Sequence, residues 1–234
     1  MTRRIAVVTG GLSGIGRATG DALAKAGHTV IAGSRRGGKD RNSLSLDVTD
    51  PTSIAAFKQT VTDRFGTPSI LVNAAGIYAE GAVTDQDTGH WHDQIAANLT
   101  GPYLMIRAFM PAMIAAGYGR IVNISSTAAH AGAAGYAGYC ASKAGLNALS
   151  RVTAVEGAPH NVTCVTLSPT WVDTPMLHAA KTRLSLSQQD VQASNPQNRV
   201  VQPQEIAAMA AFCCSDACPA LTNEDIQITA GASW

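Results

Sequence analysis

The feature that most constrains the fold is a regular alternation of short apolar runs with longer stretches of helical pattern. The runs are rich in β-branched residues and lie at residues 5–9, 29–34, 43–48, 70–73, 120–125, 162–168 and 226–229. Most are continuously apolar, which is typical of parallel strands covered on both faces. The helical stretches lie at residues 15–26, 51–65, 88–116, 139–156 and 203–214. This order predicts an α/β fold with a doubly wound parallel sheet of about seven strands.

No repeat, low-complexity tract or linker divides the chain, and its 234 residues are enough to bury one core. We therefore expect a single domain over residues 1–234. Residues 35–42 are glycine-rich and too few for a helix, so this crossover is expected to lack one. Residues 176–201 are polar and are expected to form a mobile helical flap that contacts the substrate.

Composition excludes several classes of protein. The 17 Lys and Arg residues nearly balance the 16 Asp and Glu residues, so nucleic acid and anionic membranes are not expected partners. The N-terminus lacks a secretory signal, and we see no run of about 18 apolar residues, so we expect a cytoplasmic protein. Cys213, Cys214 and Cys218 lie in an apolar helical stretch without a pair of histidines. They are expected to be buried thiols, and no metal site is expected.

A glycine-rich turn joins the first predicted strand to the first predicted helix. It reads Gly-Gly-Leu-Ser-Gly-Ile-Gly from Gly10 to Gly16. Glycines allow a tight turn and let backbone N–H groups approach a pyrophosphate at the helix N-terminus. The spacing differs from the commoner Gly-x-Gly-x-x-Gly, and by itself it also fits a tight turn without a ligand.

Tyr139 and Lys143 are spaced to share one helix face, and Ser126 precedes Tyr139 by 13 residues. A tyrosine with a pKa of about 10 is a poor base at neutral pH. A nearby ammonium and a positively charged nicotinamide would lower that pKa. Taken alone, the pair also fits an aromatic residue at a rim and a solvated lysine.

The order of the motifs decides between these interpretations. After the glycine-rich turn come Asn73-Ala-Ala-Gly76, Asn98, Asn123-Ile-Ser-Ser126, Tyr139-Cys-Ala-Ser-Lys143 and Ser168-Pro169. Over essentially the whole chain this series resembles the short-chain dehydrogenase/reductase family, and especially 3-oxoacyl-thioester and polyketide ketoreductases and small-alcohol dehydrogenases. The resemblance implies a Rossmann-like fold. It also implies an NAD(P)-dependent oxidoreductase that moves a hydride between a nicotinamide and a carbonyl or secondary alcohol, a small-molecule substrate.

The same resemblance implies a catalytic tetrad of Asn98, Ser126, Tyr139 and Lys143. Tyr139 would exchange a proton with the substrate oxygen, which Ser126 would hold by a hydrogen bond. Lys143 would bind the nicotinamide ribose and lower the pKa of Tyr139. Asn98 would hold a water that links Lys143 to solvent.

Cofactor contacts follow from the resemblance as well. They comprise Gly10, Ser13, Gly14, Ile15 and Gly16 at the pyrophosphate, Asp47 and Val48 at the adenine, Asn73, Ala74 and Gly76 at the adenosine ribose, and Pro169, Val172 and Thr174 at the nicotinamide, with Tyr139 and Lys143. The chain departs from the family at Thr170, where glycine is usual. Residues 228–232 also replace the usual Val-Asp-Gly-Gly ending.

The choice of cofactor depends on the end of the second predicted strand. An acidic residue there would bind the 2′-hydroxyl of NAD, but Ser34 and Arg35 stand there and the next carboxylate is Asp40. Arginine binds phosphate through charge-assisted hydrogen bonds, so we predict NADP(H), with NAD(H) as the weaker alternative. The alternative for Arg35 and Arg36 is that both are solvated charges on a loop.

Several other residues leave alternatives open. Ser125 and Tyr136 fail the spacing of the tetrad, and we interpret them as structural or substrate-contacting. His130 either lines the substrate cleft or is a hydrogen-bonded loop residue, whereas His90 and His92 are expected at the surface.

Two other functions fit the sequence less well than an active oxidoreductase. A cofactor-binding regulator would be expected to have lost a tetrad residue, and a nucleotide-sugar epimerase needs more chain after Lys143.

The predicted helices at 88–116 and 139–156 carry more Ala, Met and Leu than one core face needs. We therefore expect a homo-oligomer, with a tetramer favoured.

Overall fold

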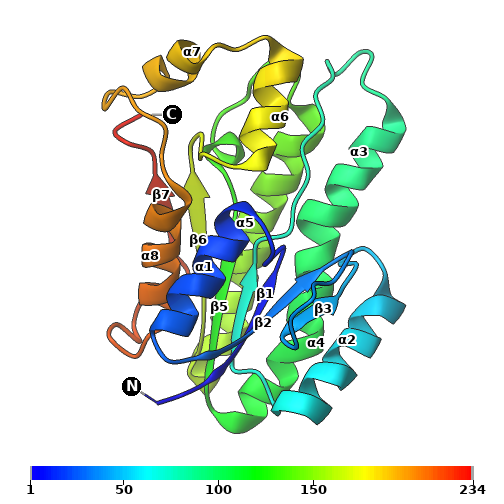
Figure 1. Ribbon diagram of the computed structural model, residues 1–234, viewed down its shortest axis with the longest axis vertical. Coiled ribbons are helices and arrows are strands. Elements are labelled where there is room, and N and C mark those ends of the chain that lie inside the picture. The colour runs from blue at the N-terminus through cyan, green and yellow to red at the C-terminus, as the bar shows by residue number, and fades with distance from the viewer. Residues whose placement is uncertain (1, 233–234) are drawn as a thin grey trace.

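Seven parallel strands form one sheet in the computed structural model, which describes residues 2–232 (Figure 1). They are β1 (Ile5–Thr9), β2 (Thr29–Ser34), β3 (Ser43–Ser45), β4 (Ile70–Asn73), β5 (Gly119–Ile124), β6 (Val162–Pro169) and β7 (Asp225–Ile228). Their order across the sheet is β3-β2-β1-β4-β5-β6-β7. The chain therefore moves outward from β1 and returns to β4, and ligands of such sheets bind where the order reverses, beyond the carboxyl ends of the strands.

Helices cover both faces of the sheet, as the continuously apolar strands predicted. On one face α1 (Gly14–Lys25) packs beside α8 (Pro203–Cys213). On the other face lie α2 (Pro51–Phe65), α4 (Gly101–Ala116) and α5 (Ala137–Gly157). Successive residues of β1 divide between the two cores, because Val7 belongs to the second face and Ala6 and Val8 to the first. The Rossmann-like prediction is confirmed.

Most predicted elements are present, with differences at their ends. The third predicted strand, 43–48, stops at Ser45, because Asp47 turns the chain by accepting hydrogen bonds from Thr49 N (2.9 Å) and Thr49 Oγ1 (2.7 Å). No helix forms over residues 35–42, as predicted. Residues 176–201 are helical in part, since they include most of α6 (Pro175–Leu184) and all of α7 (Gln188–Ala193).

The predicted helix at 88–116 is interrupted by a wider turn. It consists of α3 (Thr88–Ile95), a π-helical turn η1 (Ala96–Thr100) and α4. By length and composition this 29-residue stretch could span a membrane, since an 18-residue window within it has a mean hydropathy of 1.2, and this was not expected from the sequence. Met105, Phe109 and Met113 of α4 are fully buried in the protein core. The apolar residues of α4 are therefore needed, at least in part, for packing on the sheet.

A cluster of charged and aromatic side chains closes the opposite end of the sheet. The guanidinium carbons of Arg4 and Arg120 lie 3.3 and 4.1 Å from the centroid of the Tyr118 ring. Asp216, which follows α8, accepts hydrogen bonds from Tyr118 Oη (2.8 Å) and Arg4 (3.3 Å). The hydrogen bond from Tyr118 is the main cause that lowers the pKa of Asp216, and the hydrogen bond and charge of Arg4 and the charge of Arg120 add to it. This Tyr118 cluster joins the starts of β1 and β5 to the segment after α8.

The cysteines depart in part from prediction. Cys213 and Cys214 are buried, but Cys218 is exposed, because it lies beyond the end of α8. Within residues 2–232 no group of His, Cys, Asp and Glu side chains is arranged to hold a metal ion.

Candidate functional site

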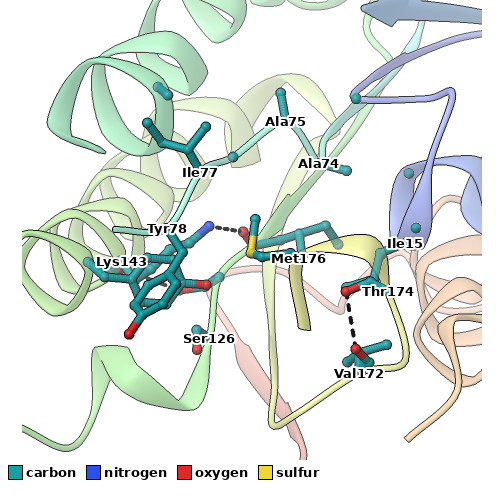
Figure 2. Close-up of a pocket in the computed structure, with 18 of the residues that line it drawn as sticks. Ile15, Ala74, Ala75, Ile77, Tyr78, Ser126, Lys143, Val172, Thr174 and Met176 are labelled. Atoms are coloured by element: carbon teal, nitrogen blue, oxygen red, sulfur yellow. Dashed lines mark hydrogen bonds between the residues drawn. The ribbon is translucent and has the colours of Figure 1, made fainter. Parts of the chain in front are cut away.

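A cavity of about 810 Å³ lies at the carboxyl ends of the strands. Its walls come from the segments that follow β1, β2, β4, β5 and β6, together with the start of α6. Figure 2 shows these segments converging, with Ile15 and Thr174 at one side and Tyr78, Ser126 and Lys143 at the other. The cavity thus occupies the place where a sheet of this topology binds its ligand.

The glycine-rich turn forms one end of the cavity. A Cβ on Gly16 would lie 2.4 Å from the carbonyl oxygen of Gly10, so the turn closes only with glycine at this position. Ser13, the N-cap of α1, makes no side-chain capping bond, although Ser13, Ile15 and Gly16 all line the cavity. The N–H groups of the first helical turn therefore lack a side-chain cap beside the cavity. Together with the helix dipole, they fit the pyrophosphate of a dinucleotide.

Ser126, Tyr139 and Lys143 all line the opposite part of the cavity. Lys143 Nζ donates a hydrogen bond to Ile124 O (2.8 Å) and lies 5.7 Å from the centroid of the Tyr139 ring (Figure 2). Ser126 Oγ accepts a hydrogen bond from Ala128 N (3.2 Å), which leaves its own hydrogen to donate toward Tyr139. The three side chains predicted to do the chemistry are therefore brought together.

The electrostatics of the protein alone keep the phenol protonated. Burial raises the pKa of Tyr139 to about 12, and a hydrogen bond from Ser126 offsets this only in part. Burial also lowers the pKa of Lys143 to about 8. Lys143 together with a charged nicotinamide was expected to lower the pKa of Tyr139, but in the protein alone Lys143 is not among the groups that shift this pKa, and desolvation dominates.

Asn98 lies behind the wall rather than on it, at the centre of the π-helical turn. Its Nδ2 donates to Ile77 O (2.9 Å) and Ser142 Oγ (3.1 Å), and its Oδ1 accepts from Ile77 N (2.9 Å). Both amide hydrogens are thus used, and the side chain anchors the loop after β4. Pro102, four residues further on, has no N–H to offer the main-chain carbonyl of Asn98.

The predicted adenosine contacts line the cavity, with one exception. Ser34, Arg35, Asp47 and Val48 line it, and so do Ala74 and Gly76. Asn73 does not, because its Nδ2 donates to Asn123 Oδ1 (2.8 Å) between the strands β4 and β5. Hydrogen bonds from Thr49 lower the pKa of Asp47, and the charge of Arg35 contributes to the same shift.

The segment after β6 closes the cavity from another side. Pro169, Val172 and Thr174, the predicted nicotinamide contacts, all line it. Thr174 Oγ1 donates to Val172 O (3.1 Å) and accepts from Leu177 N (3.3 Å), so it fixes this segment to the start of α6 (Figure 2). A Cβ on Gly14 would lie 3.1 Å from Thr174 Cγ2. The two predicted cofactor segments therefore lie against each other.

Sequence reasoning missed the aromatic residue that packs on Tyr139. The Tyr78 ring centroid lies 5.4 Å from that of Tyr139, edge to face, and 5.1 Å from that of Tyr136. Met176 also lines this part of the cavity. Tyr78 follows the Asn73–Gly76 motif by two residues, so its place after a central strand was the available signal.

The alternatives left open for Ser125, Tyr136 and His130 can be compared with the contacts that these residues make. Ser125 is buried and donates to Lys143 O (3.3 Å), and Tyr136 lines the cavity. His130 is not on the cavity wall but hydrogen-bonds Asp225 (2.6 Å between Nε2 and Oδ2), which fits the loop alternative. His90 and His92 are exposed, as expected.

Comparison with known proteins agrees with this geometry. The profile of the family described as "Enoyl-(Acyl carrier protein) reductase" matches residues 10–233. The chain is 36% identical to the 3-oxoacyl-[acyl-carrier-protein] reductase FabG of Escherichia coli, over 97% of this chain and 96% of FabG. This chain belongs to the short-chain dehydrogenase/reductase (SDR) family. It is an oxidoreductase of the SDR type.

Other SDR relatives cover nearly the whole chain as well. Acetoacetyl-CoA reductase of Allochromatium vinosum is 33% identical over 97% of this chain and 98% of its own length. Among solved structures, the ligand-free aldohexose dehydrogenase of Thermoplasma acidophilum superposes with a TM-score of 0.90 at 29% identity, covering 98% of this SDR and 93% of that chain. These relatives are named for different carbonyl and alcohol substrates on one fold.

Proposed function

We propose that this SDR transfers a hydride between NADP(H) and a small carbonyl compound or secondary alcohol, with Tyr139 as the acid/base. The observation that carries the proposal is that Ser126, Tyr139 and Lys143 share one cavity with the glycine-rich turn and the uncapped start of α1. When bound, the nicotinamide would supply or accept the hydride. The relatives named as ketoacyl, acetoacetyl-CoA and 3-oxoacyl reductases support a carbonyl substrate.

The protein's own residues would manage the proton. Ser126 would turn its hydrogen from Tyr139 to the substrate oxygen, and the phenol of Tyr139 would donate its proton to that oxygen on reduction. The high pKa of Tyr139 suits a group that begins as an acid. Lys143 has used one hydrogen on Ile124 O and would offer the others to the nicotinamide ribose.

Asn98 would act through its main chain. Its side chain is fully engaged with Ile77 and Ser142, so a water that links Lys143 to solvent would bond the Asn98 carbonyl. Pro102 supports this assignment because it cannot donate to that carbonyl. π-Helical turns of this kind are frequent at functional sites.

The residues at the end of β2 support NADP(H) over NAD(H). Arg35 lines the cavity, whereas Arg36 and Asp40 do not. Ser45 Oγ donates to Arg35 O (3.2 Å), which anchors the loop that carries the guanidinium. A guanidinium can make bidentate hydrogen bonds to a 2′-phosphate.

Tyr139→Phe tests the acid/base assignment. Reduced nicotinamide absorbance is followed with a panel of ketones and alcohols, and general acid–base catalysis contributes roughly 10²–10⁴-fold. We expect the turnover of the Phe variant to fall at least 100-fold while its affinity for NADPH stays similar. A variant that kept a tenth of the wild-type rate would remove Tyr139 from this role.

Arg35→Ala tests the cofactor assignment, with the neighbouring Arg36→Ala as the matched control. One charge-assisted hydrogen bond is worth about 1.5–3 kcal/mol, so kcat/KM with NADPH should fall about 10- to 150-fold while that with NADH hardly changes. Arg36→Ala should leave both values close to wild type. A wild-type preference for NADH that persists in Arg35→Ala would contradict the proposal.

Three further predictions from the sequence concern the substrate flap, the cellular location and the assembly. We propose that residues 176–201 act as the substrate flap of a single domain, since Met176, Leu177 and Ala180 line the cavity. A cytoplasmic location and a homotetramer also remain predictions. Acetoacetyl-CoA and aldohexose, for which two of the relatives are named, are small molecules, which fits the size of the cavity.

A further inference from the structure

Three side chains behind the cavity wall meet at the carboxylate of Asp225, on β7. Oδ1 accepts a hydrogen bond from Ser168 Oγ (2.5 Å), and Oδ2 accepts from Asn147 Nδ2 (2.6 Å) and His130 Nε2 (2.6 Å). A carboxylate can only accept, so His130 carries a hydrogen on Nε2. Asn147 Nδ2 lies 3.5 Å from the same His130 nitrogen; since both then donate to Asp225, this contact is not a hydrogen bond.

Each partner of Asp225 belongs to a different segment of the site. His130 follows a short turn that Ser126 begins, in which Ala129 N donates to Ser126 O (3.0 Å) and His130 N to Thr127 O (2.9 Å). Asn147 lies one helical turn after Lys143 on α5. Ser168 directly precedes Pro169, which begins the segment ending at Thr174.

The position of Asp225 in the fold explains how one residue reaches all three segments. β7 lies beside β6 in the sheet (Figure 1), and Asp225 is paired to Thr166, two residues before Ser168. The side chains of His130 and Asp225 are 31% and 20% exposed, so water competes only in part for these bonds. Asn147 Oδ1 is buried without a partner among the described residues, so the Asn147 amide depends on Asp225.

We propose that Asp225 is a positioning residue for the reaction proposed above. It holds the turn of Ser126, the helix of Tyr139 and Lys143, and the segment that closes over the nicotinamide in one arrangement. Asp225, His130, Asn147 and Ser168 do not line the cavity, so this role is exerted through the residues that do. The inference rests on the proposed function for its kinetic consequence, but its structural consequence can be measured separately.

The expected signature is a loss of kcat with little change in cofactor affinity. A displacement of about 1 Å at the reacting groups can cost on the order of 100-fold in rate. Cofactor affinity should be retained, because the glycine-rich turn and Arg35 do not contact Asp225. Loss of folding stability alone would not produce this pattern in a protein assayed well below its melting temperature.

Asp225→Asn is the main test, because it keeps the size of the side chain and removes its charge and one acceptor. Its matched control is Glu224→Gln, the same change at the neighbouring exposed residue, whose side chain makes no hydrogen bond in the described structure. We expect kcat of Asp225→Asn to fall about 10- to 100-fold with an NADPH Kd within about threefold of wild type. Glu224→Gln should stay within about twofold in both.

His130→Ala provides a second variant should Asp225→Asn fold poorly. We expect it to show part of the loss in kcat. Combining it with Asp225→Asn should cost less than the product of the two single losses, since both remove the same contact. A kcat within twofold of wild type in both folded single variants would overturn the proposal.

Hydrogen–deuterium exchange separates this proposal from the proposed function. In Asp225→Asn, exchange should increase in residues 126–130, 143–147 and 168–174 and remain unchanged in β1 and β4. If wild-type protein turned over no carbonyl or alcohol, the proposed function would fail while this exchange pattern could still be measured. Unchanged exchange in all three segments would overturn the positioning role.

Discussion

Two glycines of α1, four residues apart, are expected to respond to alanine in opposite directions. A Cβ on Gly16 would lie 2.4 Å from the carbonyl oxygen and 2.8 Å from the carbonyl carbon of Gly10. Both atoms belong to the backbone of the same tight turn, so they cannot swing aside as a side chain would. On Gly20 the nearest atom to the added Cβ would be Val30 Cγ1 at 3.5 Å, an ordinary contact.

The size of each effect follows from these contacts. Forcing an extra carbon into a packed site typically costs about 1–3 kcal/mol, and the short contact with Gly10 places Gly16→Ala near the upper end. The helix preference for alanine offsets about 1 kcal/mol of this. Gly16→Ala should therefore lower the free energy of unfolding by about 2 kcal/mol, while Gly20→Ala should raise it by about 0.5–1 kcal/mol.

Calorimetry and a cofactor titration measure both consequences. For a chain of this length about 1 kcal/mol corresponds to about 2–4 °C in Tm, so we expect a fall of about 4–8 °C for Gly16→Ala and a rise of about 1–4 °C for Gly20→Ala. Because Gly16 lines the cavity and Gly20 does not, only Gly16→Ala should weaken NADPH binding. A Gly16→Ala protein that melts at or above the wild-type temperature would show that the turn relaxes freely, and the reasoning would fail.

Two further predictions concern stability and assembly. Since the hydrogen bond from Tyr118 lowers the pKa of Asp216, this carboxylate stabilises the fold above its unfolded pKa of about 3.9, and the contribution is lost as the pH falls through the lower folded value. The Tm gap between wild type and Asp216→Asn should therefore be largest at neutral pH and shrink below about pH 4, and a gap that stayed constant from pH 7 to 3 would contradict this. Tyr103 on α4 and Val155 on α5 are 47% and 66% exposed, so we expect light scattering to give an oligomer that Val155→Asp weakens. A monomeric wild type at micromolar concentration would refute the assembly.

The strands, and the place of the candidate reacting residues on one cavity, could be predicted because local signals determine them. β1, β2 and β4 match their predicted bounds, since each contains a short apolar run rich in β-branched residues. The helical spacing of Tyr139 and Lys143, the spacing to Ser126 and the resemblance to the family together indicated these three residues, and all three line the cavity. These features depend on a few neighbouring residues and on the order of motifs along the chain.

The features that were missed depend on contacts between distant segments. Asn73 and Asn98 carry the expected motifs, but their side chains are drawn behind the wall by Asn123 and by the backbone of Ile77. The bonds of Asn98 are made from within the π-helical turn, and a periodicity of 3.6 residues cannot indicate such a turn. Asp225 was not considered because its three partners come from separate segments, and no pattern near residue 225 refers to them.

The Tyr118 cluster limits the order in which parts of the fold can form while the ribosome synthesises the chain. Arg4 and Asp216, which bond each other there, are separated by 212 positions. At synthesis rates of about 5–20 residues per second, Arg4 waits on the order of 10–40 s for its carboxylate to be made. During that interval the central strand β1 can pair with β2 and β4. Arg4, which directly precedes β1, still lacks Asp216, the carboxylate that it bonds in the folded protein. The sheet can therefore begin to form early from its centre, while the end that holds Tyr118 is completed only when nearly all of the chain has been made.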